Sequence, residues 1–245
     1  AAEQAFCTAD YVTQRLEAAL SFACQHNRGQ PVPVLGYCMG GVLALALAQR
    51  RRLDVKSLVL VATPWDFHAA STVAQRQHLL MMQPGLAALA QRHALFMPEV
   101  LQFLLIGGAP MSVAERFARF GGAGGQDDAG HFALVEGWLN DGVPIASKAA
   151  MECLFSWYVA NAPLCGEWRV DGTAIRPETL EVPSLIACAR RDGIVPPEAS
   201  RPLKDRISSS VWLLAEAGHI GMVAGRTAEH VLWKPVAEWL YRKGS

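Results

Sequence analysis

Four short apolar runs near the two ends of the chain predict a buried sheet. The runs occupy residues 31–37, 55–62, 183–189 and 209–214. Uninterrupted apolar runs are typical of strands buried on both faces of a parallel sheet. Apolar residues at helical spacing fill the stretches 9–25, 40–49 and 227–242. The order of strand, helix and strand predicts parallel βαβ units, and therefore an α/β fold in which helices flank a mainly parallel sheet.

The middle of the chain breaks this pattern. Residues 68–177 contain helical stretches rich in leucine, methionine and phenylalanine, which are interrupted by glycine-rich segments such as 121–125. No strand pattern is visible there. We therefore expect a core made of residues 1–67 and 178–245, with residues 68–177 inserted as a helical cap over the site described below.

Composition excludes several kinds of partner. With 245 residues, 51% hydrophobic and 18% charged, the chain can bury one core together with a cap. Its formal net charge of +0 gives no indication of a nucleic acid or an acidic membrane surface as partner. No apolar run approaches the roughly 20 residues that span a bilayer. A homodimer is left open.

The six cysteines are scattered, and no two have CxxC spacing. A zinc or thioredoxin-like site is therefore unexpected, and we predict no metal and no cofactor. Scattered cysteines are typical of reduced thiols, which predicts a cytoplasmic protein. The chain begins at Ala1 without a signal-like segment, and a fragment of a longer chain is one interpretation.

The motif Gly36-Tyr37-Cys38-Met39-Gly40 lies between a predicted strand and a predicted helix. Its G-x-C-x-G spacing corresponds to the G-x-S-x-G nucleophile elbow, a sharp turn that lifts the nucleophile off the end of the sheet. Glycines two residues away on either side would leave room for the turn. The motif predicts a cysteine nucleophile, and the alternative is a glycine-rich turn around an inert buried thiol.

A cysteine nucleophile needs a base, and the order nucleophile, acid, histidine is that of α/β hydrolases. Asp192 follows the third apolar run, and His219 follows the fourth. Because parallel strands end at one edge of the sheet, we expect His219 within hydrogen-bond reach of Asp192 and close to Cys38. In this interpretation His219 is the base and Asp192 orients it.

Other interpretations of these residues stay open. Asp66 follows the second apolar run and is the alternative acid. A turn-forming role is the simpler explanation for Asp66. Asp192 and His219 could likewise be an exposed loop aspartate and a solvated loop histidine.

The elbow also predicts half of an oxyanion hole. The backbone N–H of Met39, directly after the nucleophile, would face the developing negative charge. The second donor normally lies on a loop upstream of the elbow. Only 37 residues precede Cys38, with a pattern of one helix and one strand. We therefore expect the donor loop and the N-terminal strands of the fold to be missing from this chain.

Several motifs together resemble the polyhydroxyalkanoate synthase family. They are GYCMGG at 36–41, ATPWDF at 62–67, WLNDGVP at 138–144, RDGIVP at 191–196 and GHIG at 218–221, with Tyr158 and Asn161. The resemblance implies an α/β-hydrolase fold and a hydroxyacyl-coenzyme A thioester as acyl donor. It implies that Cys38 takes the acyl group, that His219 is the general base supported by Asp192, and that a polyester hydroxyl accepts the acyl group.

Two further functions remain as alternatives. The first is a cysteine-based hydrolase of esters or thioesters, including a polyester depolymerase-like enzyme. It differs from a synthase only in using water in place of a hydroxyl as the acceptor. The second is a non-catalytic interaction protein with the same fold, against which the Cys38, Asp192 and His219 set argues.

Overall fold

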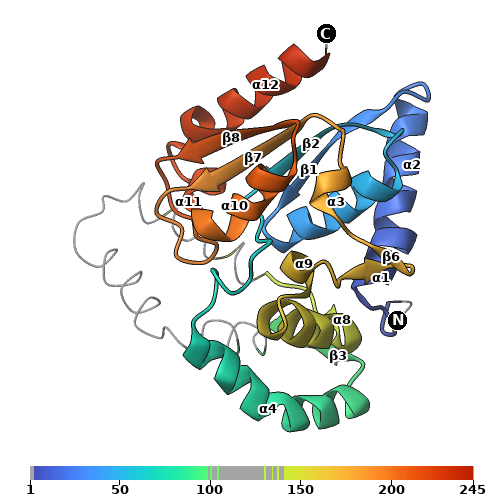
Figure 1. Cartoon of the computed structure of the whole chain (residues 1–245), viewed down its shortest axis with the longest axis vertical. Coiled ribbons are helices and arrows are strands. Elements are labelled where there is room, and N and C mark those ends of the chain that lie inside the picture. The colour runs from blue at the N-terminus through green and yellow to red at the C-terminus, as the bar shows by residue number, and fades with distance from the viewer. Residues whose placement is uncertain are drawn as a thin grey trace.

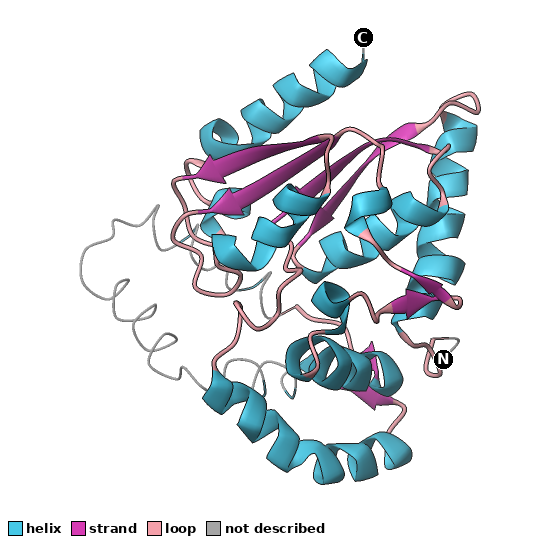
Figure 2. Cartoon of the chain, in the orientation of Figure 1, coloured by secondary structure: helices cyan, strands magenta, loops and turns pink. Residues whose placement is uncertain are grey.

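A four-stranded parallel sheet is the centre of the protein (Figures 1 and 2). The computed structural model describes residues 3–98 and 141–244 and, between them, residues 100, 104, 130, 134 and 137. The strand order is β1-β2-β7-β8. The bounds are β1 Val32–Tyr37, β2 Val55–Val61, β7 Ser184–Ala189 and β8 Ser210–Ala215. Each predicted apolar run is a strand, so the predicted parallel sheet is confirmed.

Helices cover both faces of the sheet (Figure 2). One face packs against the N-terminal helical segment, α3 and α10, and the other against the C-terminal helical segment. The bounds are α1 Thr8–Asp10, η1 Tyr11–Leu16, α2 Glu17–His26, α3 Met39–Arg50, α10 Pro197–Arg206, α11 Gly221–Ala224, η4 Glu229–Trp233 and α12 Lys234–Gly244. The segments labelled η1 and η4 are single wider turns of π-helix within longer helices.

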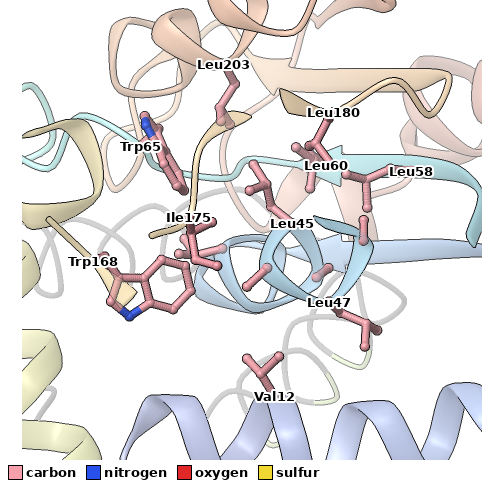
Figure 3. Close-up of a cluster of buried hydrophobic side chains, with 14 of the residues drawn as sticks. Val12, Leu45, Leu47, Leu58, Leu60, Trp65, Trp168, Ile175, Leu180 and Leu203 are labelled. Atoms are coloured by element: carbon pink, nitrogen blue, oxygen red, sulfur yellow. The ribbon is translucent and has the colours of Figure 1, made fainter. Parts of the chain in front are cut away.

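Alternation along β2 explains why the sheet holds two separate clusters of apolar side chains. Leu58 and Leu60 point into the cluster shared with α3, whereas Val59 and Val61 point into the cluster shared with α12. Figure 3 shows leucines of β2 and α3 converging in the first cluster. Full burial of such a side chain contributes about 1.5–3 kcal/mol, so both faces stabilise the sheet that positions the site.

The middle of the chain forms a largely helical unit beside the sheet (Figure 1). Its main helices are α4 Val73–Arg92, α8 Ser147–Met151, the π-helix η2 Glu152–Val159 and α9 Ala162–Cys165. Leu79 and Leu86 of α4 share an apolar cluster with Leu154 of η2. Thr72 begins α4 with a capping box to Gln75, which satisfies free N–H groups at the helix start.

Short strands in the middle of the chain are a correction to the expected absence of strands. Two pairs occur there: β3 Leu95–Phe96 with β4 Ile145–Ala146, and β5 Arg169–Val170 with β6 Thr173–Ala174. A 3₁₀ turn, η3 Pro177–Thr179, leads back to the sheet. Two residues are too few to show the alternation that reveals a strand in a sequence. The glycine-rich stretch 121–125 lies outside the described residues, and the cap with bounds 68–177 stays a prediction.

Candidate active site

Cys38 occupies a sharp turn between β1 and α3. Its backbone angles are φ 54° and ψ −128°, a region that non-glycine residues rarely adopt. The Cys38 N–H donates a 2.8 Å hydrogen bond to the carbonyl of Val61 on β2. This bond fixes the strained turn to the neighbouring strand, and the thiol is half-buried. The geometry is that of a nucleophile elbow.

Two glycines make the turn possible, but they are not the two expected from the motif. A Cβ on Gly36 would lie 2.5 Å from the Cα of Gly41 and 2.7 Å from the carbonyl oxygen of Gly40. A Cβ on Gly41 would overlap the side chain of Thr63. A Cβ on Gly40 would meet nothing within 4 Å. Close packing was expected at Gly40, but it occurs at Gly41. Gly41 lies on the side of α3 that faces Thr63, in the segment after β2.

Asp192 and His219 meet at the same edge of the sheet. Nδ1 of His219 lies 2.7 Å from Oδ2 of Asp192, and the exposed fractions of the two side chains are 8% and 0%. The other carboxylate oxygen, Oδ1, accepts hydrogen bonds of 2.8 Å from the N–H groups of Ile194 and Val195. Asp192 is therefore held by its own loop and presents one oxygen to the imidazole. The expected contact is present, while the catalytic roles of both residues stay predictions.

His219 is electrostatically coupled to both neighbours. Burial of the imidazole lowers its pKa, but hydrogen bonds to Asp192 and to Cys38, together with the charges of those groups, outweigh burial and raise the pKa from 6.5 to about 9. At neutral pH the imidazole is thus protonated.

Asp66 contacts other groups. Its Oδ1 accepts hydrogen bonds from Nδ2 of Asn161 at 2.9 Å, from the N–H of His68 at 2.9 Å and from the N–H of Ala69 at 3.2 Å. Oδ1 of Asn161 in turn accepts from the N–H of Phe67 at 2.9 Å. Because His219 pairs with Asp192, the contacts favour the turn-forming interpretation of Asp66.

The N–H of Met39 belongs to the first turn of α3, where N–H groups have no acceptor within the helix. The Cys38 N–H, by contrast, is occupied by Val61. Met39 therefore keeps the donor expected of half an oxyanion hole. The strand before the elbow, β1, is an edge strand of the sheet within the described part of the chain.

Two tyrosines near Cys38, which the sequence marked only as parts of family motifs, have contacts that the sequence did not predict. Burial, followed by the charges of Cys38 and Cys153, raises the pKa of Tyr158 far above its usual value. The ring of Tyr158 lies edge-on to Phe67 with 5.0 Å between ring centroids. The end of η2 therefore lies within electrostatic range of the elbow. Tyr37, the other tyrosine, contacts His219.

A search of the described residues finds no group of three or more His, Cys, Asp or Glu side chains that could hold a metal ion. Within the same part of the chain, no helix is both long and apolar enough to cross a membrane.

Comparison with known proteins agrees with the fold described above. The family model for the alpha/beta hydrolase fold matches residues 2–120. A monoacylglycerol lipase from Paleococcus ferrophilus superposes with a TM-score of 0.54 at 16% identity, over 93% of this chain and 75% of that chain. The meta-cleavage product hydrolase CumD from Pseudomonas fluorescens gives a TM-score of 0.51 at 16% identity, over 98% and 73%. At such identities these structures establish the fold alone.

Curated relatives point to one group within that fold. The poly(3-hydroxyalkanoate) polymerase subunit PhaC of Haloferax mediterranei is 27% identical over 237 residues, which cover 94% of this chain and 47% of that protein. The PhaC subunit of Thiocystis violacea is 22% identical over 243 residues, which cover 98% and 68%. The chain is similar to these polymerase subunits over nearly all of its length, and it has the α/β-hydrolase fold. The predicted resemblance and fold class are confirmed.

The sequence similarity to the polyhydroxyalkanoate polymerase subunits extends over nearly all of this chain but only over part of each relative. The chain spans 47% of the Haloferax protein and 49% of the PhaC subunit of Haloarcula marismortui. About half of the length of these synthases therefore has no counterpart in the 245 residues.

Proposed function

We propose that this chain is a polyhydroxyalkanoate synthase-like acyltransferase that moves hydroxyacyl groups from coenzyme A thioesters through Cys38, His219 and Asp192. The observation that carries the proposal is the 2.7 Å contact between His219 and Asp192 at the strand ends beside the strained Cys38 turn. A nucleophile, a base and an orienting acid at one sheet edge form the minimal set for acyl transfer.

In the first half of the reaction Cys38 becomes acylated. The Cys38 sulfur, in the deprotonated form that attacks thioesters, adds to the thioester carbonyl beside the His219 imidazolium, and the Met39 N–H donates to the oxyanion of the tetrahedral intermediate. The intermediate collapses as the carbon–sulfur bond to coenzyme A breaks. The departing thiolate takes the proton of His219 and leaves as free coenzyme A thiol. The products are an acyl-cysteine and a neutral imidazole.

In the second half a hydroxyl group accepts the acyl chain. Acylation removes the Cys38 charge and hydrogen bond, which are two of the contributions that raise the pKa of His219. The imidazole is therefore a better general base at this stage than in the resting enzyme. It takes the proton of the incoming hydroxyl as the oxygen attacks the acyl-cysteine. The new ester then leaves, and the thiolate and imidazolium pair is restored.

The test is to incubate the chain with 3-hydroxybutyryl-coenzyme A. Released coenzyme A together with insoluble polymer supports the synthase, whereas release together with soluble 3-hydroxybutyrate favours the hydrolase. Intact-mass measurement before turnover should find one acyl group, and peptide mapping should place it on Cys38. Acylation of Cys153, Cys165 or Cys188 in place of Cys38 would contradict the proposal.

Two variants control this experiment. Cys38→Ser keeps the shape of the elbow but replaces the thiol by a hydroxyl that is far harder to deprotonate, so thioester transfer should fall strongly while the fold stays intact. Cys165→Ala removes the exposed thiol of α9 and should transfer at the wild-type rate. Equal thioester turnover by Cys38→Ser would show that sulfur is incidental and would favour a general hydrolase.

A further inference from the structure

A tyrosine within the elbow joins the strand that carries the nucleophile to the loop that carries the histidine. Tyr37 is the last residue of β1 and directly precedes Cys38. Its hydroxyl donates a 3.2 Å hydrogen bond to the backbone carbonyl of His219. Its ring centroid lies 5.0 Å from the imidazole centroid, with 34° between the planes. We propose that Tyr37 is a positioning residue that holds His219 against Cys38; this inference rests on the proposed role of His219.

The topology shows why His219 needs a second restraint. Its loop follows β8, and β8 and β1 are at opposite ends of the strand order β1-β2-β7-β8. Three strand spacings of about 4.8 Å separate β8 from β1, so the histidine loop must extend across the strand ends to reach Cys38. Asp192, after β7, holds the imidazole through Nδ1. Tyr37 holds the backbone of the same residue from the Cys38 side.

The two contacts of Tyr37 have different physical origins. Burial, followed by the charges of Cys38 and Asp192, raises the pKa of the phenol above its ordinary value, so the hydroxyl remains a donor at neutral pH. The ring lies beside an imidazole that is protonated at neutral pH, and an aromatic ring close to a cation stabilises it. The hydroxyl therefore restrains the loop, and the ring supports the charged form of the base.

Substitutions can separate these contacts. Tyr37→Phe removes the hydroxyl and keeps the ring, whereas Tyr37→Leu removes both. Tyr11 provides a matched control, because its ring packs on Phe6 with 5.3 Å between centroids, in the N-terminal helical segment. Tyr11→Phe and Tyr11→Leu should leave acylation unchanged. Urea unfolding of all four variants shows which of them are folded under the assay conditions.

Acylation of Cys38 and titration of His219 provide the measurements. Tyr37→Phe should slow single-turnover acylation by roughly 2- to 10-fold, the range expected for one lost hydrogen bond, with an unchanged substrate KM. The pKa of His219, followed by NMR, should stay near 9 in that variant. Tyr37→Leu should slow acylation further and lower this pKa. If Tyr37→Leu does not fold, the acylation rate of Tyr37→Phe still tests the positioning role of Tyr37.

Wild-type acylation rates in folded Tyr37 variants would overturn the inference. Equal losses in the Tyr11 variants would do the same, because they would reveal a general effect on stability. The test is separable from that of the proposed function, since alkylation of Cys38 by iodoacetamide across a pH series needs no substrate. If the wild-type chain does not act on hydroxyacyl-coenzyme A but its alkylation profile changes in Tyr37→Leu, the proposed function fails and the role of Tyr37 is retained.

Discussion

The loops after β2 and β7 both carry an aspartate at the same edge of the sheet, yet the two aspartates have different surroundings. Asp192, after β7, is fully covered and pairs with His219. Asp66, after β2, is partly exposed and binds Asn161 and two backbone N–H groups. The strand order explains the difference, because β7 neighbours β8, which leads to His219, whereas the β2 loop meets the helical unit that carries Asn161. The location of the strand, and not the residue type, decides which aspartate contacts His219 and which one caps a turn.

The largest effect should separate the two carboxylates in catalysis. Asp192→Asn should lower acyl transfer on the order of 10³-fold, because an amide neither stabilises the imidazolium nor fixes its tautomer. Asp66→Asn should remain within a few-fold of wild type, since it keeps an oxygen at the same place. Initial rates of coenzyme A release measure both. Similar rates for the two variants would remove the distinction between the loops.

A second substitution tests the packing of the loop after β2 against the elbow. Gly41→Ala should reduce the free energy of unfolding by about 3 kcal/mol, because the added Cβ overlaps the buried Thr63 at the start of that loop. Gly40→Ala is the matched control, and it should be nearly neutral because open space surrounds the position. Urea denaturation gives both values. Equal destabilisation would mean that the two glycines are equivalent.

Removal of the Asp66 carboxylate should affect stability more than turnover. Asp66→Ala should reduce the free energy of unfolding by about 2 kcal/mol, since the side-chain amide of Asn161, only 3% exposed, loses its acceptor. Activity per folded molecule should change little. Thermal unfolding together with active-site titration distinguishes these effects. A large loss of specific activity in fully folded protein would bring Asp66 into the catalytic group.

The stability of the protein should also depend on pH through the contact between Asp192 and His219. The pKa of His219 is raised from 6.5 to about 9 in the folded protein, so its contribution to stability is fully present below pH 6.5 and is lost as the pH rises through 9. Unfolding midpoints should therefore decline over this interval. The decline should be weaker in Asp192→Asn, in which a raising contribution is absent, and unchanged in Asp66→Asn. An unaltered pH profile in Asp192→Asn would contradict the coupling.

Several features of the fold and site followed from the sequence because their physical causes are local. Apolar runs marked all four main strands, and the G-x-C-x-G spacing marked the turn at Cys38, whose φ of 54° needs close glycine packing. The chain order placed Asp192 and His219 after adjacent strands. Gly41, Tyr37 and the two-residue strands were not found, since each depends on a partner distant in the sequence.

The sequence by itself determined which residues could perform the chemistry and on which strand each would lie, because burial periodicity and turn-forming residues act over a few positions. Only the tertiary structure shows which of Asp66 and Asp192 contacts His219. Both have the same chemical group and both follow a buried strand, so no local pattern separates them. The choice depends on strand order and on which loop folds back, which are set by packing between segments far apart in the chain.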